Sequence, residues 1–398
     1  MSKVIEIDHA DVDLLNEYYE LCCYAFDRPN NEAYQTKWLN LAMHSRDYAI
    51  VDDQGHVQSA LMVTYLPVNW HGQDYQMGAV GYVASYPEFG GHGSITQLMQ
   101  KATEQMLADH VVLSYLAPFS YTFYRRFGFE ELFDRVCYQV KATEFPRISL
   151  SAAGSVERVN FTDALEQMAS IYDQNQQSQN GALIRHSWWQ QYRYSKHPKY
   201  EVALSYDDQQ QLDGYLIYQR NSGEAFELVE LMPSNFASFQ RLMNFVGKHA
   251  NVYPKFIYES ANQMPYNDLM PEAYHVQTSI IPYMMARVND WQALVEEWHF
   301  TADLTKPLLI EIQDQFIPQN NGVWELSVKD GRGQLLHSSE LTADLVINTR
   351  QLAKVFLGYR TLKQLLQTNH CQINTVSAIS QLQASLNYAD KPMLWDYF

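Results

Sequence analysis

The chain has 398 residues, of which 46% are hydrophobic and 18% charged, and its formal net charge is −17. This length predicts two or three domains, and the composition is that of a folded protein rather than a disordered one. The acidic balance argues against DNA or RNA as a partner and favours a cationic substrate, although an acidic surface that only keeps the protein in solution explains the same charge.

No stretch approaches the ~18 apolar residues that span a bilayer, and the first eight residues lack the basic and apolar regions of a signal peptide. The four Cys form no Cys-x-x-Cys pair, and the 13 His show no metal-ligand spacing, so the sequence predicts neither a metal site nor a disulfide framework. Together these features predict a cytoplasmic protein without a membrane segment.

The first 145 residues alternate predicted strands and helices. A helix over 12–23 has an apolar face, and a second helix from Ser94 carries Leu98, Met99, Ala102 and Met106 as an apolar stripe. Strands are predicted at 3–7, 47–51, 58–66, 76–85, 111–116 and 133–140, and a short helix at 119–127. The resulting order, β-α-β-β-β-α-β-α-β, is that of an α/β domain.

Two further segments follow. In the second, helices are predicted at 164–174, 187–194 and 238–249, and a strand at 213–219. A third segment begins near residue 286, with strands at 307–315 and 322–329 and amphipathic helices at 349–357 and 362–368. No low-complexity linker separates the segments, which predicts closely packed domains.

A glycine-rich turn carries the candidate chemistry. The stretch Glu88-Phe89-Gly90-Gly91-His92-Gly93 follows a strand and leads into the helix at Ser94, the context in which backbone N–H groups and the helix dipole bind an anion. Ser94 would cap the helix or donate to a phosphate oxygen. Ordinary turn chemistry also explains such a turn, which matches neither a Walker loop nor a dinucleotide fingerprint.

Residues 1 to about 145 resemble the GNAT (Gcn5-related N-acetyltransferase) fold, whose loop reads Gln/Arg-x-x-Gly-x-Gly/Ala. Glu88 replaces the usual Gln or Arg, and Gly90 replaces the Arg that often precedes the first glycine, so cofactor binding would fall to backbone amides. The full chain resembles the Eis (enhanced intracellular survival) branch, through Tyr124-Arg125-Arg126-Phe127-Gly128-Phe129 and through stretches 343–347 and 356–360 of its last segment.

This resemblance implies an α/β (α+β) protein with a catalytic GNAT domain (1–145), a degenerate GNAT-like domain (146–285) and a sterol-carrier-like α+β domain (286–398). It implies direct transfer of acetyl from acetyl-CoA to a primary amine of an aminoglycoside, polyamine or lysine acceptor, by a homo-oligomer, either a trimer or a hexamer. The implied acetyl-CoA contacts are Gly81, Tyr82, Val83, Phe89, Gly90, Gly91, His92, Gly93, Ser94, Phe119 and Ser120.

An amine must lose a proton before it attacks, and the departing thiolate must gain one. By its pattern alone Tyr124 is either the acid or a packed core tyrosine; the resemblance implies that it is the proton donor. The aromatic end of the chain, Asp396-Tyr397-Phe398, is predicted to dock rather than to extend into water. Docking alone is one interpretation, whereas the resemblance implies that the Phe398 α-carboxylate is the base.

An acceptor pocket is predicted around Phe26 and Tyr82, through cation–π contacts, and around Asp27 and Asp396, through charge. Leu61, Met62 and Val63 are further candidates, and core packing or surface solvation explains each of these residues as well. The alternative function is a non-catalytic protein that binds acyl-CoA or a hydrophobic ligand. A third interpretation is a scaffold whose last domain delivers the C-terminus.

Overall fold

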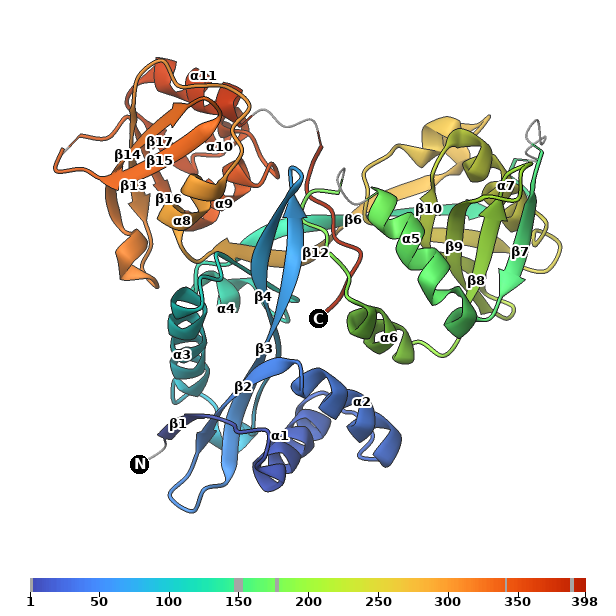
Figure 1. Cartoon of the computed structure of the whole chain (residues 1–398), viewed down its shortest axis with the longest axis horizontal. Coiled ribbons are helices and arrows are strands. Elements are labelled where there is room, and N and C mark those ends of the chain that lie inside the picture. Colours follow the sequence, from blue (N-terminus) through green and yellow to red (C-terminus); the bar gives the residue numbers. More distant parts are fainter. Residues whose placement is uncertain (1–2, 147–152, 176–178, 341, 387–389) are drawn as a thin grey trace.

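The computed structural model describes residues 3–146, 153–175, 179–340, 342–386 and 390–398. They form three lobes (Figure 1), which we call the first lobe (3–146), the central lobe (153–288) and the third lobe (289–386). The remaining residues, 390–398, form a C-terminal tail that returns from the third lobe and ends between the other two (Figure 1). No helix within the described residues combines the length and hydropathy needed to cross a membrane.

The first lobe contains the elements expected from the sequence and one helix that was not predicted. Its strands are β1 (Lys3–Glu6), β2 (Ser45–Val51), β3 (Val57–Trp70), β4 (Gln73–Ser85), β5 (Leu113–Leu116) and β6 (Glu130–Lys141). Its helices are α1 (Val12–Ala25), α2 (Glu32–Ala42), α3 (Ser94–Ala108) and α4 (Tyr121–Arg125), with a 3-10 turn η1 (Pro87–Phe89). The unpredicted helix is α2, which buries only Trp38, Leu41 and Ala42 and therefore has a short apolar stripe.

Helices cover both faces of this sheet. Tyr18 of α1 and Trp38 of α2 pack in one buried cluster with Met62 of β3. Leu98 of α3 and Tyr124 of α4 pack in a second cluster, on the opposite face, together with Leu61 and Val63 of β3. Side chains alternate along a strand, so successive residues of β3 point in turn into the two clusters. We call the two sides of the sheet the α1 face and the α3 face, after the helices that cover them.

The central lobe repeats this strand and helix pattern. Its strands are β7 (Ser155–Val159), β8 (Tyr200–Tyr206), β9 (Leu212–Asn221), β10 (Ala225–Pro233), β11 (Lys255–Ser260) and β12 (Gln277–Val288). Its helices are α5 (Leu165–Asn175), α6 (Ser187–Ser195) and α7 (Phe236–Gly247), with 3-10 turns η2 (Phe161–Ala164), η4 (Tyr266–Leu269) and η5 (Ala273–His275).

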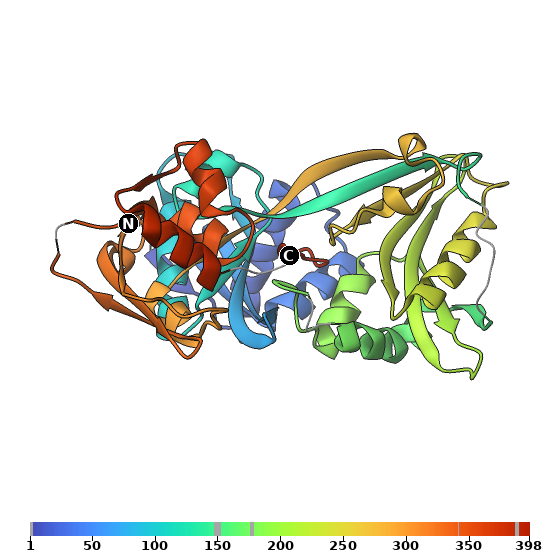
Figure 2. The same ribbon diagram turned by 90° about the horizontal axis from the view of Figure 1, so that it is seen from above.

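One twelve-stranded sheet runs through both lobes, in the order β1-β2-β3-β4-β5-β12-β6-β11-β10-β9-β8-β7. Strand β12 pairs antiparallel with β6 and, over Met285–Val288, with β5. Strand β6 in turn pairs with β11 of the central lobe. Figure 2 shows β6 and β12 crossing side by side from one lobe to the other. The predicted boundary at 285–286 therefore falls inside a strand that belongs to both lobes.

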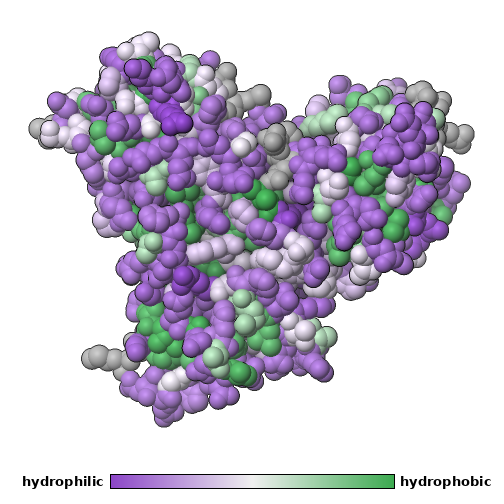
Figure 3. Space-filling model, in the orientation of Figure 1, coloured by the Kyte–Doolittle hydropathy of each residue, from purple (hydrophilic) through white to green (hydrophobic). Residues whose placement is uncertain are grey.

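The third lobe is a five-stranded sheet, in the order β15-β14-β13-β16-β17, with four helices. Its elements are α8 (Trp291–Glu297), β13 (Leu308–Gln313), η6 (Pro318–Asn320), β14 (Gly322–Lys329), β15 (Arg332–His337), β16 (Leu345–Asn348), α9 (Thr349–Phe356), α10 (Leu362–Gln367), β17 (Cys371–Ile373) and α11 (Val376–Ser385). A buried ion pair from Arg287 Nη2 to Asp314 Oδ2, at 2.8 Å, joins it to the end of β12. The face of the molecule in Figure 3 is mostly hydrophilic, as the acidic composition predicts.

Candidate active site

The candidate site begins where strand β4 stops pairing with its neighbour β5. The two strands pair in parallel only from Met77–Leu113 to Val80–Leu116. Within the described residues, β4 has no strand partner on that side beyond Val80. A bulge in the pairing with β3, between Met62–Gly81 and Ala60–Ala84, contains Tyr82, whose φ is +49°. The bulge turns backbone groups at positions 81–83 out of the regular ladder. The Tyr82 carbonyl accepts from the Tyr18 hydroxyl at 2.9 Å, and backbone N–H groups here can donate to a ligand.

The glycine turn joins β4 to α3. Gly91 and Gly93 have φ of +85° and +80°, a left-handed conformation that favours glycine, and a Cβ on either would meet no atom within 4 Å. Gly93, rather than Ser94, is the N-cap of α3 and makes no side-chain cap bond, so the predicted capping role of Ser94 is wrong. The first turn of α3 carries no acidic residue. Its free N–H groups and open approach fit the pyrophosphate of a coenzyme A donor.

Substituting Gly93 is expected to weaken donor binding. Alanine is strained in the left-handed region by about 1–2 kcal/mol, and relief of that strain would turn the first N–H groups of α3 away from the anion. We expect Gly93→Ala to raise the Kd for acetyl-CoA about tenfold in calorimetry.

Gly72→Ala is the matched control for this substitution. Gly72 has φ of +79° and the same open surroundings, but it lies in the turn between β3 and β4 (Figure 1). Its substitution should lower the melting temperature similarly and leave the Kd unchanged. Equal Kd values for the two variants would contradict an anion site at Gly93.

The other predicted donor contacts lie around this opening. Phe89, Gly90 and His92 belong to the turn, and of these Phe89 is half-buried and the other two are exposed. Phe119 is 72% exposed where the chain leaves β5. The hydroxyl of Ser120 caps α4 by accepting a hydrogen bond from the Phe123 N–H at 3.3 Å.

Tyr124 of α4 lies inside the α3-face cluster and is 3% exposed. Its ring makes edge contacts with Phe119 at 5.3 Å and Phe123 at 5.2 Å between centroids. Burial, and then the nearby Tyr397 of the tail, raise the pKa of Tyr124, so its hydroxyl keeps its proton at neutral pH. It is therefore a packed tyrosine, and its hydroxyl is in the protonated form that an acid requires.

The tail brings the last carboxylate to the β4 bulge. A Cβ placed on Gly81 would lie 3.8 Å from the carboxyl carbon of Phe398. The Phe398 ring packs on the α1 face, 5.8 Å from the ring of Trp189 in α6. Among the described residues, no cationic side chain lies at ion-pair distance from this carboxylate. Tyr124 and Phe398 thus pack on opposite faces of the sheet.

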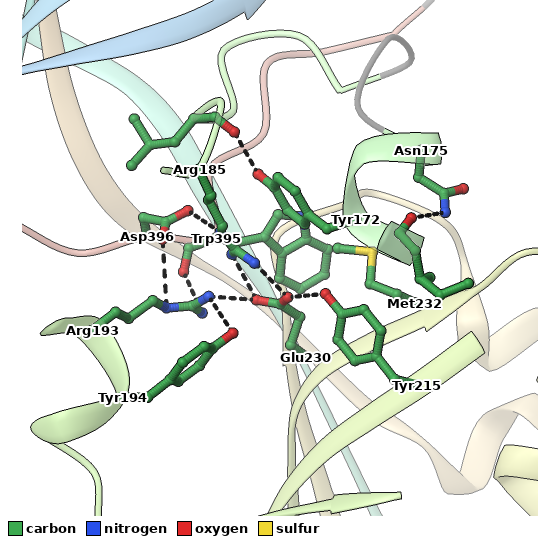
Figure 4. A network of polar contacts seen from close by, with 12 residues as sticks. Tyr172, Asn175, Arg185, Arg193, Tyr194, Tyr215, Glu230, Met232, Trp395 and Asp396 are labelled. Carbon is green, nitrogen blue, oxygen red and sulfur yellow. Dashed lines mark hydrogen bonds and ion pairs between the residues drawn. The ribbon is translucent and has the colours of Figure 1, made fainter. Parts of the chain in front are cut away.

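A buried ionic network anchors the tail (Figure 4). Arg185 donates to Glu230 through two hydrogen bonds of 2.8 Å and to Asp396 Oδ2 at 3.1 Å. Arg193 pairs with Glu230 at 2.8 Å and with Asp396 at 3.5 Å, and Trp189 Nε1 donates to Asp396 Oδ1 at 2.9 Å. Burial alone would raise the pKa of Glu230, but Arg185 and Arg193 hold it well below its usual range.

Backbone groups of the tail are held as well. The Trp395 carbonyl accepts from Arg135 Nη2 at 2.9 Å and from Arg193 Nη2 at 3.2 Å, and the Asp396 carbonyl accepts from the Tyr283 hydroxyl at 3.0 Å. Asp396 is 0% exposed and fully engaged. Its predicted role of attracting an acceptor cation is therefore wrong: it anchors the tail.

The predicted acceptor residues separate into two groups. Phe26 is 40% exposed and meets Tyr82 edge-on at 5.9 Å, and Asp27 beside it is exposed with φ of +50°. Met62 is 1% exposed beneath them on the α1 face and cannot touch an acceptor. Leu61 and Val63 pack on the α3 face, opposite the other candidates, so their assignment to the acceptor pocket is also wrong.

Helix α6 of the central lobe brings aromatic residues to Tyr82 that the sequence did not indicate. The Tyr192 hydroxyl lies 3.3 Å from the Tyr82 hydroxyl, and the Tyr192 ring lies 5.5 Å from that of Trp189. The only local signal was the aromatic Trp188-Trp189 pair in a predicted helix. In the described residues, no three His, Cys, Asp or Glu side chains come together as a metal site would require.

Comparison with known proteins finds domain models that match most of the chain. Models of an acetyltransferase (GNAT) domain match residues 6–132 and 181–288, and a sterol carrier protein domain model matches residues 292–395. A probable N-acyltransferase from Enterococcus faecalis V583, described as a conserved protein of unknown function, is 30% identical over 100% of both chains, with a TM-score of 0.93.

Two more distant structures share the fold. A GCN5-related N-acetyltransferase from Anabaena variabilis is 19% identical, with a TM-score of 0.86, and Eis1 from Mycobacterium abscessus is 17% identical, with a TM-score of 0.81; each covers 100% of both chains. No curated protein matches the sequence. The predicted fold class, two GNAT domains and a sterol-carrier-like domain, is confirmed.

Proposed function

The chain belongs to the GNAT N-acetyltransferase family, in the Eis-like arrangement of two GNAT domains and a sterol carrier protein domain, and we propose that it transfers acetyl from acetyl-CoA directly to a primary amine. An acyl-CoA co-substrate and an amine acceptor follow from the family. We assign catalysis to the domain over 1–145, with acceptors of the aminoglycoside, polyamine or lysine type. We also propose that the protein forms a homo-oligomer.

The observation that carries the proposal is the position of the chain terminus. The Phe398 carboxylate lies against Gly81, at the bulge where β4 separates from β5. Simple docking of an aromatic end would not require the terminal charge to face this opening, and among the described residues no cation neutralises it. A charge in this position is suited to accept a proton from an amine that approaches along the α1 face.

The structure of the central lobe supports our assignment of catalysis to the first lobe. Its β10 and β11 pair in parallel around α7, as β4 and β5 do around α3. However, Asn235 caps α7, accepting from the Ser238 N–H at 2.8 Å while Ser238 Oγ accepts from the Asn235 N–H at 3.2 Å. This capping box satisfies the helix N-terminus where α3 leaves it open. We therefore propose that residues 146–285 form a degenerate domain whose role is to hold the tail.

The proposed reaction assigns one task to each residue. Bound acetyl-CoA supplies the thioester. Backbone groups at 81–83 orient its carbonyl, and the Phe398 carboxylate takes the proton that the attacking amine loses. The amine nitrogen forms a bond to the carbonyl carbon of the thioester. The carbon–sulfur bond then breaks as the Tyr124 hydroxyl gives its proton to the sulfur, and the new carbon–nitrogen bond remains in the product amide. Proton exchange with solvent then restores both groups.

Tyr124→Phe tests the acid. Loss of a positioned acid lowers rates by about 10²–10⁴-fold, so we expect kcat to fall by at least 10²-fold while the Kd for acetyl-CoA is unchanged. Tyr121→Phe, which removes a hydroxyl from the same helix, is the control and should retain activity. A Tyr124→Phe protein as fast as the wild type across an amine panel would remove Tyr124 from the mechanism.

A further inference from the structure

The hydroxyl of Tyr18 reaches the β4 bulge from helix α1 and takes no part in the proposed reaction. It donates to the Tyr82 carbonyl at 2.9 Å, and the Tyr18 side chain is 0% exposed. Burial raises the pKa of Tyr18 well above its usual range, so the hydroxyl keeps the proton that this bond needs. The rings of Tyr18 and Tyr82 both pack edge-on against Trp38, at 5.0 and 6.3 Å between centroids, which fixes the donor against the strand.

Tyr82 holds a backbone conformation that is unfavourable for a residue with a side chain. Its φ of +49° lies in the left-handed region. The pairing of β4 with β3 passes from Gly81 to Ala84, so neither Tyr82 nor Val83 has a paired residue on β3. A return of Tyr82 to extended backbone would rotate its carbonyl away from Tyr18. The Tyr18 hydrogen bond therefore stabilises the bulge in its present form.

The same bond fixes the direction of the next N–H group. The Tyr82 carbonyl and the Val83 N–H belong to one peptide group, and in a trans peptide group the two point in opposite directions; no described peptide bond is cis. Because the carbonyl points to Tyr18 on the α1 face, the Val83 N–H points away from that face, toward the side on which Tyr124 packs. None of the described strands pairs with β4 beyond Val80 on the β5 side, so a ligand can accept from this N–H.

We propose that Tyr18 is a positioning residue for acetyl transfer: its hydrogen bond to the Tyr82 carbonyl directs the Val83 N–H at the carbonyl oxygen of the thioester. The inference rests on the proposed acetyl transfer and adds to it the group that orients one hydrogen-bond donor. The thioester oxygen gains negative charge when the amine attacks. An N–H that is fixed before the reaction therefore stabilises the transition state more than it stabilises the bound donor.

Tyr18→Phe tests the inference, because it removes the hydrogen bond and keeps the ring. The Tyr82 carbonyl would lose its donor, and the peptide group would turn to find another. We expect kcat to fall at least about tenfold, toward the ~10²–10³-fold cost of losing an oxyanion donor. The Kd for acetyl-CoA in calorimetry should change little, since the glycine turn and α3 bind the pyrophosphate.

The infrared stretching frequency of the thioester carbonyl reports the hydrogen bond itself. It is measured on bound acetyl-CoA without an amine, by difference between unlabelled and isotope-labelled donor. A hydrogen bond to the oxygen polarises the carbonyl and lowers this frequency. We expect the frequency in the wild-type complex to lie below that of free acetyl-CoA, and most of the difference to be lost in Tyr18→Phe. A purely structural role of Tyr18 would not change it.

Tyr19→Phe is the matched control. Tyr19 is the next residue of α1, is 1% exposed and also donates to a backbone carbonyl, that of Asn31 at 3.2 Å. This variant should lose similar stability and keep the wild-type kcat and carbonyl frequency.

Three results would overturn the role of Tyr18 and leave the acetyltransferase proposal standing. They are a wild-type carbonyl frequency in Tyr18→Phe, a kcat no lower than that of Tyr19→Phe, or a wild-type complex whose frequency equals that of free acetyl-CoA. The last result needs no variant, so the inference can be tested even if Tyr18→Phe does not fold. Absence of transfer to every amine of a panel, by a folded wild type, would refute both proposals.

Discussion

A chain extended by Gly-Ser beyond Phe398 is expected to lose at least about 10²-fold in kcat/KM, because the extension moves the terminal carboxylate away from Gly81 and replaces it with a neutral amide. The Kd for acetyl-CoA should change little, since the glycine turn lies on the other side of β4. Steady-state kinetics with the best amine of a panel, together with calorimetry of donor binding, measure the two effects separately.

The control for the extension keeps the carboxylate and changes the ring. Phe398→Leu retains the charge at the same chain position and loses the contact between the Phe398 and Trp189 rings, at 5.8 Å. Its rate should fall far less than that of the extended chain. If both proteins lost activity equally, aromatic docking rather than the carboxylate would be the important feature of the terminus.

The second large effect is expected from Asp396→Asn. Arg185 and Arg193 are both buried and share Glu230 and Asp396, so the substitution leaves two buried cations with one carboxylate. Breaking a buried pair in this way costs about 3–5 kcal/mol, which shifts the docking equilibrium of the tail by about two to four orders of magnitude. Activity should fall with it, although Asp396 touches no reactant.

Release of the tail can be followed directly by limited proteolysis. The rate of chymotryptic cleavage after Trp395, which is 3% exposed in the docked tail, should rise in Asp396→Asn and remain low in the wild type, as read by intact mass. Asp390→Asn removes an exposed carboxylate from the same tail and should behave as the wild type. An Asp396→Asn protein with wild-type activity and with the bond after Trp395 still protected would mean that the network does not hold the tail.

The local parts of this fold could be predicted from the sequence. The helix at Ser94 and the strands around it have clear periodicity, and the glycine turn is a short motif whose residues are adjacent in the chain. Helix α2 was not predicted because its apolar stripe is short. The crossing of β12 into the first lobe was not predicted, because it depends on pairing between residues that lie 138 to 156 positions apart in the chain. No local pattern records such pairing.

The same distinction holds for the candidate site. Tyr124 and Phe398 were predicted from a motif and a chain end, and the structure places them in the clusters on opposite faces of the sheet. Asp396 was misassigned because its burial depends on Arg185 and Arg193, which are far away in the sequence. Leu61 and Val63 were misassigned because the strand is predictable, whereas the face to which each residue points is set by the helices on either side.

An extension of the chain that can be removed again tests most directly whether the terminal carboxylate of Phe398 is the base. A chain with one Lys added after Phe398 should be nearly inactive, and a carboxypeptidase specific for basic residues then removes that Lys and restores the native end. We expect kcat/KM to return to the wild-type value in the same preparation, in step with the loss of Lys by mass. An extended chain that is already as active as the trimmed one would contradict the role of Phe398.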